Sequence, residues 1–350
     1  MEGRWGGGYD EGLMTSKLLQ QLDRFGPAQC EKMDYVQADA YTQELAESHY
    51  ENFTVVSWFL PKRLRADFRH VYAFCRWADD LGDETGDREK SVELLGWWKK
   101  ELDACYAGRP RHPVFVALSK TIEFHDIPQK PFDDLIDAFV QDQKVLRYGT
   151  WEQTVDYCKR SADPVGRLVL YVCGYRDRER QELSDATCTA LQLANFWQDV
   201  RRDVLERDRI YMPEDVARKH HLDLELMAKA IVEDGKAQAK GIHGSGCPCC
   251  SGSALGIEVV RPAYRATMRE LVGRTRELFV KGRGLWPMLE PDVRLDIKLF
   301  TLGGEAILKM IQGQNYDTLT HRPSLSKGAK LGLMMRAVVG KMFCLGGGKR

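Results

Sequence analysis

The chain has 350 residues, of which 43% are hydrophobic and 29% are charged. This length allows one large domain or two ordinary ones, and this composition is typical of a soluble protein with a sizeable core. Lys and Arg together number 51, as do Asp and Glu, so the formal net charge is zero. The balance excludes a broad basic surface for nucleic acid, and no apolar run reaches the roughly 18–20 residues of a membrane span.

The N-terminal residues and the cysteines both indicate a cytoplasmic protein. Residues 1–10 are rich in glycine, carry Glu2, Arg4 and Asp10, and lack the apolar stretch of a signal peptide. Most of the 10 cysteines are scattered through helical patterns. That placement is typical of thiols in a reducing compartment rather than of a disulfide framework.

Helical patterns follow one another along most of the chain. Residues 1–38 are expected to form a flexible tail with a short helix at best, and residues 343–350 a second tail. Between them, residues 39–342 show almost no strand alternation, so we expect a single all-α domain. The predicted helices span residues 41–53, 63–83, 92–106, 112–124, 131–146, 151–175, 184–205, 262–279, 294–312 and 326–342.

In two of these helices, particular residues predict a break or an end of the helix. Pro164 and Gly166 predict a kink or an interruption in the helix over residues 151–175. Ser184 is expected to cap the N-terminus of the helix over residues 184–205.

Residues 241–256 interrupt the helical pattern with a run of Gly, Ser and Cys. This composition predicts an inserted, flexible surface loop. The alternative is a zinc site, because the stretch contains His243, Cys247, Cys249 and Cys250. The paired CxxC spacing of structural zinc sites is absent, however, so the loop is the favoured interpretation.

Two acidic clusters carry most of the functional information, DDLGDE over residues 79–84 and NFWQDVRRD over residues 195–203. In each, two aspartates stand at positions i and i+4, so a helix presents both on one face, where like charges repel. Mg²⁺ offsets that repulsion, because it takes one or two carboxylates and completes its octahedron with water and phosphate oxygens. Two such faces opposed across a cavity would clamp a diphosphate, whereas a solvated acidic helix face is the usual alternative. The pairs are Asp79 with Asp83 and Asp199 with Asp203, and Asn195 adds an amide oxygen to the second face.

The residues around the clusters resemble a known family. The chain reads VYAFCRWADDLGDE over residues 71–84, LQLANFWQDVRRD over residues 191–203 and RIYMP over residues 209–213. These stretches resemble the signature motifs of the squalene/phytoene synthase family, in order and at about the family separation, and the similarity extends from about His49 to about Arg336. The resemblance implies an all-α isoprenoid-synthase fold, a helical bundle around a central cavity, and head-to-head prenyl transfer.

Two shorter stretches look like one branch of that family, the hydroxysqualene synthases of hopanoid pathways. They are the His-x-Glu-Asn-Phe form over residues 49–53 and the sequence SADPVGR over residues 161–167. The branch resemblance implies presqualene diphosphate as substrate and hydroxysqualene as product, formed by ionisation, rearrangement and a water quench without NADPH. It also implies hand-over of the product to other enzymes of squalene and hopanoid biosynthesis.

The resemblance also implies the residues of the site. The paired aspartates would bind about two or three Mg²⁺ ions that bridge the diphosphate and act as Lewis acids. The implied metal ligands are Asp79, Asp83, Asn195, Asp199 and Asp203. The implied substrate-binding residues are Asn52, Phe53, Tyr72, Arg76, Tyr157, Gly166, Gln192, Asn195, Arg209 and Tyr316.

Several of these residues have a structural alternative. Arg76 reaches the diphosphate through its guanidinium fork or pairs with carboxylates of its own helix. The four aromatic residues line an apolar tunnel for carbocations or belong to the core. Gly166 allows close approach of the prenyl chain or of a neighbouring helix. Where related enzymes often have arginine before the second motif's first aspartate, this chain has Gln198, which removes a positive charge.

A water-quenching enzyme needs polar groups that place one water beside the cation. His49, Glu51 and Asn52 are the candidates, because they coincide with the branch-specific stretch. We therefore expect Glu51 or His49 to orient the attacking water.

Other functions compete with this interpretation. Within the family they are squalene, presqualene diphosphate and phytoene synthase activity. A chain-elongating prenyltransferase fits the first DDxxD motif but not the second cluster, and a non-catalytic helical scaffold does not account for the intact aspartates. An amphipathic stretch over residues 327–341 predicts either peripheral contact at the inner face of the cytoplasmic membrane or packing on the domain.

Overall fold

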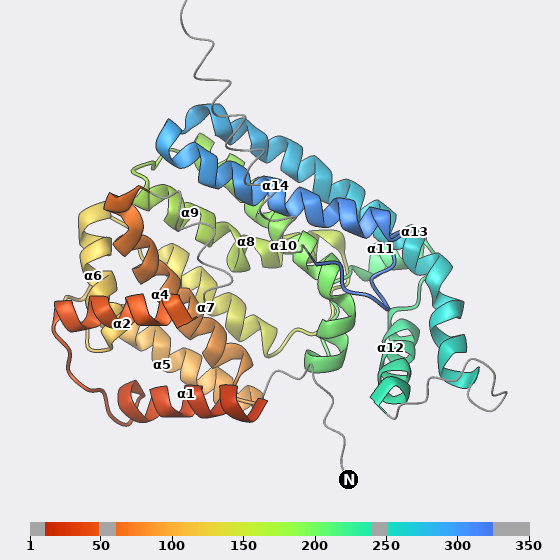
Figure 1. The fold of residues 1–350 in the computed structure, drawn as a ribbon, viewed down its shortest axis with the longest axis horizontal. Coiled ribbons are helices and arrows are strands. Elements are labelled where there is room, and N and C mark those ends of the chain that lie inside the picture. Colours follow the sequence, from red (N-terminus) through yellow and green to blue (C-terminus); the bar gives the residue numbers. More distant parts are fainter. Residues whose placement is uncertain (1–10, 49–60, 240–250, 325–350) are drawn as a thin grey trace, which may run out of the picture. The chain divides into compact units, whose positions relative to one another are not determined.

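The regular structure of the chain is helical, as the sequence predicts (Figure 1). A computed structural model describes residues 11–48, 61–239 and 251–324. Over these ranges the exception is an isolated parallel bridge between Arg147 and Ile210. None of the helices described has the length and apolar character needed to cross a membrane. The predicted all-α fold class is therefore confirmed.

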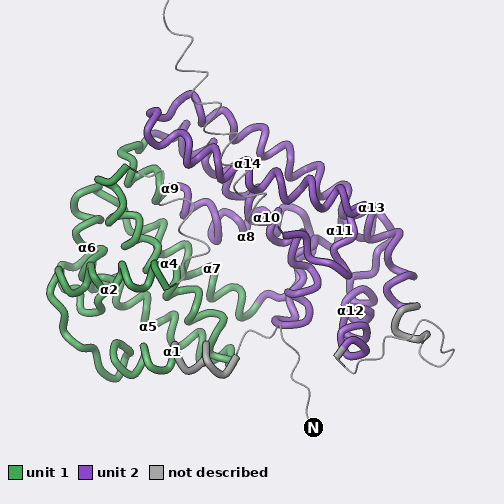
Figure 2. Tube along the Cα trace, viewed as in Figure 1, with its two compact units in different colours: residues 1–144, 167–176 green, residues 145–166, 177–350 purple. Residues whose placement is uncertain are grey.

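The chain divides into two compact units (Figure 2). Unit 1 comprises residues 1–144 and 167–176, and unit 2 comprises residues 145–166 and 177–350. The first acidic cluster therefore belongs to unit 1 and the second to unit 2. The organisation of residues 39–342 as one domain stays a prediction.

Unit 1 is built of helices around a cluster of aromatic side chains. Trp98 stacks on Trp77 at a ring-centroid distance of 5.4 Å and contacts Phe115 at 4.5 Å. His112 is fully buried against Trp98, and this burial lowers the pKa of its imidazole to about 3, so the ring is neutral. The helices are α1 (Glu11–Phe25), α2 (Tyr35–Ser48), the short 3₁₀ turn η1 (Lys62–Leu64), α4 (Arg65–Asp83), α5 (Arg88–Tyr106), α6 (Pro113–His125) and α7 (Lys130–Asp142).

Helix α4 is held from the core side, which leaves its other face for the first acidic cluster. Phe74, Trp77 and Leu81 follow the i, i+3, i+7 spacing and are buried in the aromatic core. Gly82 is buried as well, and its carbonyl accepts a hydrogen bond from Gln143 Nε2 just beyond α7 (3.0 Å). These contacts fix the rotation of α4 about its axis and therefore the direction of its aspartates.

Helix α1 corrects the expectation of a flexible tail over residues 1–38. The helix has 15 residues, and Leu18 and Phe25, seven positions apart, are both buried. The Phe25 ring lies 5.2 Å from the ring of Tyr41 in α2. The apolar stripe of α1 therefore packs on unit 1, and the polar, glycine-containing flanks hid that stripe in the sequence.

Unit 2 is organised around α10, which packs against α8, α12, α13 and α14. Trp197 of α10 is fully buried and donates its Nε1 hydrogen to Thr275 Oγ1 of α13 (2.8 Å). The remaining elements of the chain are α8 (Trp151–Ser161), α9 (Asp163–Val172), α10 (Arg178–Arg207), α11 (Glu214–Lys219), α12 (Leu224–Ala239), α13 (Ser251–Gly282), the 3₁₀ helix η2 (Arg283–Met288) and α14 (Pro291–Gly313). The division between the units crosses α9 after Gly166.

The predicted interruption of the helix over residues 151–175 is confirmed. Helix α8 ends at Ser161, Ala162 leaves helical geometry with φ −128° and ψ −48°, and α9 begins at Asp163. Asp163 is only 3% exposed and accepts a hydrogen bond from Thr189 Oγ1 of α10 (2.7 Å). The break therefore places a buried carboxylate against α10.

The predicted helix cap at Ser184 is wrong. Helix α10 begins two turns earlier, at Arg178, and its cap is Asp177, whose side chain accepts the backbone N–H of Arg180 (3.0 Å). Ser184 is instead buried inside the helix.

The predicted loop over residues 241–256 is too long at its C-terminal end. Residues 251–256 form the beginning of α13. The rest of the loop, including its four candidate zinc ligands, lies outside the described residues.

Gly166 lies where α9 meets α10. A Cβ atom at this position would approach Ser184 Oγ and Cys188 Sγ more closely than the 3.0 Å that real Cβ atoms keep. Helix packing, one of the two expected explanations, therefore accounts for the glycine. Contact of Gly166 with a prenyl chain stays a prediction.

Glu270 of α13 ties α11 to α13. Its Oε2 accepts a hydrogen bond from Lys219 Nζ (2.8 Å) and lies 2.7 Å from His220 Nε2, while its Oε1 accepts from Arg274 Nη2 (2.7 Å). These donors, Lys219 foremost, lower the pKa of Glu270 to about 2. Because α11 directly follows residues 209–213, the cluster fixes one end of that segment.

We predict that Gly166→Ala lowers the free energy of unfolding by about 1–3 kcal/mol, because the added methyl overpacks the contact with α10. In a Ser184→Ala/Cys188→Ala background the same change should cost almost nothing. Gly273→Ala in α13, where no atom lies within 4 Å, is the matched control and should be neutral or stabilising by up to about 1 kcal/mol. Urea unfolding measures all three, and a Gly166→Ala protein more stable than the parent would contradict this packing.

We predict that Glu270→Gln costs about 1 kcal/mol at pH 7, because the neutral amide loses its ionic partners. Glu270 has a lowered pKa in the folded chain, so its contribution is present above pH ~4.5 and is lost as the pH falls towards 2. Urea unfolding at steps from pH 7 to pH 3 should show the two proteins converging below pH ~4.5. Glu277→Gln, at an exposed position of the same helix, is the control. A gap that stays constant with pH would refute the assignment.

Candidate functional site

The first acidic face belongs to α4 in unit 1. Tyr72, Arg76, Asp79 and Asp83 stand at i, i+4, i+7 and i+11, so they share the face opposite the aromatic core. Asp83 is exposed, and the other three side chains are half-buried. The helix therefore presents the aspartate pair on one side, as the spacing predicts, and its metal role stays a prediction.

Arg76 is the cation of this face. Its guanidinium pairs with Asp79 Oδ2 (3.3 Å), with Asp80, and with Glu84 Oε1 (2.9 Å). Of the two expected roles, ion pairing with its own helix is the one observed, and diphosphate contact stays a prediction. One arginine therefore forms ion pairs with three carboxylates. Because its single positive charge does not balance their three negative charges, this group keeps a net negative charge when the carboxyl groups are ionised.

Asp80 shows how crowded these carboxylates are. Burial, with repulsion from Glu84 and Asp79, raises the pKa of Asp80 to about 8, although Arg76 opposes the shift. Its buried Oδ1 lies beside the Arg76 guanidinium without a well-formed hydrogen bond. Carboxyl groups that are close together and short of donors are an environment that a divalent cation stabilises.

The second acidic face belongs to α10 in unit 2. Gln192, Asn195, Asp199 and Asp203 stand at i, i+3, i+7 and i+11, so they share one face. Asn195 is exposed, Gln192 and Asp199 are half-buried, and Asp203 is buried. The buried Trp197 holds the rotation of α10 and therefore the direction of this face.

Asp203 is the buried end of the second face. Its burial, with repulsion from Asp199, raises the pKa of Asp203 to about 7, while Arg207, Arg209 and Arg202 oppose the shift. Arg209 is 6% exposed, and its backbone N–H donates to the Asp203 carbonyl (3.0 Å). Residues 209–213, here called the RIY segment, therefore begin directly against the second acidic cluster, the second motif.

The donor atoms of both faces fit Mg²⁺. They are carboxylate and amide oxygens, the ligands of hard cations. Within the described part of the chain, no three His, Cys, Asp or Glu side chains come together as a complete metal site. Mg²⁺ suits such incomplete sets, because it retains water and takes substrate phosphate oxygens.

Tyr157 lies in an aromatic cluster of unit 2. Its ring is 6.0 Å from Phe196 and 5.6 Å from Tyr211, and these two stack at 3.8 Å with planes 4° apart. The cluster therefore joins the second motif to the RIY segment through buried rings. Tyr316 is half-buried and has a left-handed backbone (φ 60°), with the Arg269 guanidinium 5.0 Å from its ring. For both tyrosines, lining a tunnel stays a prediction.

A cation on the second face was not predicted from the sequence. Arg322 pairs with Asp199, its Nη2 lying 3.1 Å from Oδ2 and its Nε contacting Oδ1. Next to it, Gln198 is 7% exposed and its Nε2 donates to the Pro323 carbonyl (2.5 Å). Arg322 therefore places a positive charge beside the residue that follows Gln198, although it lies 123 residues after Asp199 in the chain.

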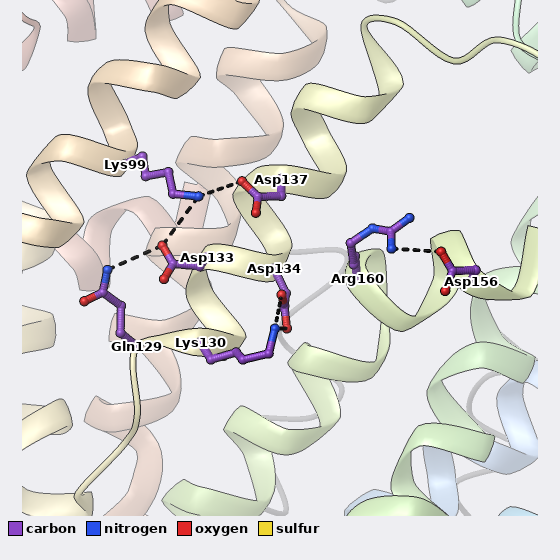
Figure 3. Close-up of polar contacts among 8 residues, drawn as sticks. All are labelled: Lys99, Gln129, Lys130, Asp133, Asp134, Asp137, Asp156 and Arg160. Carbon is purple, nitrogen blue, oxygen red and sulfur yellow. Dashed lines mark hydrogen bonds and ion pairs between the residues drawn. The ribbon is translucent and has the colours of Figure 1, made fainter. Parts of the chain in front are cut away.

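A second DDxxD sequence, at Asp133, Asp134 and Asp137 of α7, has a different environment (Figure 3). Lys99 of α5 reaches Asp137 Oδ1 (2.7 Å) and Asp133 Oδ1 (3.8 Å), and Lys130 holds Asp134 Oδ1 (2.7 Å). Each carboxylate therefore has a lysine partner, and the spacing alone does not make a metal site.

Several predicted residues lie outside the described ranges, and their roles stay predictions. The residues outside the described ranges include the segment over residues 49–60 and the stretch over residues 326–342, for which a helix is predicted. The site residues affected are His49, Glu51, Asn52 and Phe53.

Comparison with known proteins gives the family. The sequence model for squalene/phytoene synthases matches residues 46–241 and 252–329. The chain is 32% identical to the hydroxysqualene synthase of Rhodopseudomonas palustris, over 84% of this chain and 91% of that protein. It is 29% identical to the phytoene synthase of Thermus thermophilus, over 85% of this chain and 91% of that protein.

A solved structure agrees with the sequence comparisons. The crystal structure of squalene synthase HpnC from Alicyclobacillus acidocaldarius matches 80% of this chain and 95% of its own, with a TM-score of 0.68 and 40% identity. The chain therefore belongs to the squalene/phytoene synthase family, whose members are enzymes that act on prenyl diphosphates.

Proposed function

We propose that the chain is a Mg²⁺-dependent hydroxysqualene synthase. It converts presqualene diphosphate and water into hydroxysqualene and diphosphate, which requires no reductant, so NADPH is not expected. The observation that carries the proposal is the likeness to the Rhodopseudomonas palustris hydroxysqualene synthase over most of the chain. The branch-like stretch over residues 161–167 supports it.

The paired aspartates hold the metal that carries the substrate diphosphate. Asp79 and Asp83 act from α4, and Asn195, Asp199 and Asp203 from α10. Bound Mg²⁺ supplies positive charge and Lewis acidity that ease departure of the diphosphate. The support is the shared helix face within each set and its carboxylate and amide oxygens. Arg76 and Arg209 are the side chains that contact the leaving diphosphate.

The carbocation needs an apolar surround with π-faces and few nucleophiles. Phe53, Tyr72, Tyr157 and Tyr316 provide the rings, while Gln192, Asn52 and Gly166 border the prenyl chain. Tyr157 is the best supported, because its buried ring contacts the stacked pair of Phe196 and Tyr211.

The reaction ends when one ordered water attacks the cation. Glu51 or His49 orients that water, and the carboxylate or imidazole accepts its proton. Their place in the branch-specific stretch over residues 49–53 supports this role.

A second candidate function is head-to-head transfer from farnesyl or geranylgeranyl diphosphate, as in squalene, presqualene diphosphate or phytoene synthases. The similarity to the Thermus thermophilus phytoene synthase favours it. Incubation with farnesyl diphosphate alone discriminates, because a hydroxysqualene synthase leaves it unchanged.

The product is an apolar alcohol that water dissolves poorly. We propose a cytoplasmic enzyme that contacts the inner face of the membrane through residues 327–341 and hands the product to a following enzyme of squalene and hopanoid biosynthesis. Sedimentation with and without anionic vesicles tests this, and a chain that stays in the supernatant would contradict it.

We predict that Asp79→Asn and Asp199→Asn each lower turnover of presqualene diphosphate by roughly 100-fold or more, because loss of an outer-shell partner alone costs a metal site 10–100-fold. Asp134→Asn in the DDxxD sequence of α7 is the matched control and should leave turnover within about twofold of the parent. Product is quantified by gas chromatography with Mg²⁺, with and without NADPH. Full activity of Asp79→Asn or Asp199→Asn would overturn the metal role.

We predict that Glu51→Ala, which leaves the metal ligands in place, releases diphosphate but reduces the hydroxysqualene formed by roughly 10- to 100-fold, because the water is no longer oriented. His49→Ala is measured alongside to identify which residue acts. Separate assays of diphosphate release and of alcohol yield give the ratio. Hydroxysqualene at the parent rate from both variants would disprove the assignment.

A further inference from the structure

Residues 317–324, here called the strap, run along the second motif of α10 in unit 2. Thr318 Oγ1 donates to the Trp197 carbonyl (2.9 Å), and Arg201 Nη1 donates to the Leu319 carbonyl (3.1 Å). The strap therefore contacts α10 at more than one residue of the motif. Together with the Gln198 and Arg322 contacts, four motif residues between 197 and 201 hold the strap.

The strap is anchored firmly at its beginning. Asp317 is 7% exposed and pairs with Arg261 Nε (3.3 Å) and Arg265 Nη2 (3.2 Å) of α13. Its Oδ1 also accepts the backbone N–H of Leu319 (3.1 Å), and Thr318 lies 2.5 Å from Tyr264 Oη. Asp317 and Thr318 therefore hold the beginning of the strap. Further along, the hydrogen bond from Gln198 to Pro323 holds it.

Gln198 and Arg322 act on adjacent points of the strap. The buried amide of Gln198 holds the carbonyl of Pro323, the residue directly after Arg322. Arg322 is about half exposed, with 49% of its side chain accessible, whereas the Asp199 side chain is 18% accessible. The buried hydrogen bond from Gln198 to Pro323 therefore sets the position of the more exposed Arg322 guanidinium.

We propose that Gln198 is a positioning residue that keeps Arg322 on Asp199 until a divalent cation replaces it. The proposal rests on the metal role of Asp199 proposed above. A cation that binds Asp199 must take the carboxylate oxygens that Arg322 contacts, so the two compete. Metal binding at the second motif is then weaker than the carboxylates alone would give, and it is coupled to release of Arg322.

Two other arginines of the motif, Arg201 and Arg202, have different partners. Arg201 pairs with Asp234 Oδ2 (2.8 Å), and Arg202 pairs with Glu206 Oε2 (2.8 Å). They contribute a general positive field at Asp199 but do not take its oxygens. Direct competition is therefore distinguishable from the field by comparing variants.

Mn²⁺ binding to the full, substrate-free chain tests the proposal by electron paramagnetic resonance. The sites that Asp203→Asn removes are assigned to the second motif. Arg322→Gln should bind Mn²⁺ there roughly two- to fivefold more tightly, which matches the worth of an exposed ion pair. Arg202→Gln removes the same charge from α10 and should change the affinity less than twofold.

A double-mutant cycle tests the positioning role of Gln198. Gln198→Leu should tighten Mn²⁺ binding in the parent and have no further effect in the Arg322→Gln background, because it acts through Arg322. The thermal midpoint of each variant checks folding. If Gln198→Leu does not fold, Gln198→Met, which keeps an unbranched side chain but loses the amide donor without adding charge, replaces it in the cycle.

Two results would overturn the proposal. One is unchanged or weaker Mn²⁺ binding by Arg322→Gln, and the other is an equal gain from Arg202→Gln. Additive effects of Gln198 and Arg322 would remove the positioning role. These titrations contain no prenyl substrate, so their outcome is separate from whether the parent forms hydroxysqualene.

Discussion

Repulsion between carboxylates that share one helix face is the constraint on which both acidic faces depend. The helical repeat places Asp79 beside Asp83 on α4 and Asp199 beside Asp203 on α10. Guanidinium groups lie beside each face, that of Arg76 at the first and those of Arg322 and Arg207 at the second. The repulsion that remains is what the proposed binding of a divalent cation and a diphosphate would relieve at each face.

The core supplies the rigidity that this arrangement needs. Trp77 stacks on Trp98 in unit 1, and Trp197 bonds to Thr275 in unit 2. Each tryptophan lies on the side of its helix away from the aspartates. A large buried ring therefore fixes the rotation of each helix, and the acidic face cannot turn away to relieve its own repulsion.

Comparison with the α7 aspartates shows why spacing alone is insufficient. Asp133 and Asp137 repeat the pattern, but Lys99 from α5 lies between them (Figure 3). A lysine in that position neutralises the pair, because its ammonium occupies the place of a cation. At these α7 aspartates, lysines from α5 and from α7 itself therefore complete a structural ion cluster.

Local sequence patterns predicted the helices that carry the candidate site residues. They did not predict contacts between residues that are far apart in the sequence. The aspartate spacing and the apolar repeat predicted α4 and α10, and Pro164 with Gly166 predicted the break before α9. Ser184 was mistaken for a cap because a serine looks the same inside a helix, while the true cap, Asp177, lies two turns earlier. Arg322 had no signal, since 123 residues separate it from Asp199.

The most direct test of the central claim is the origin of the product's oxygen. The chain is incubated with presqualene diphosphate and Mg²⁺ in water enriched in ¹⁸O, and the alcohol is analysed by mass spectrometry. Our account predicts hydroxysqualene with one ¹⁸O atom, formed without NADPH and not formed when Mg²⁺ is chelated. A hydrocarbon product, or consumption of farnesyl diphosphate under the same conditions, would contradict it.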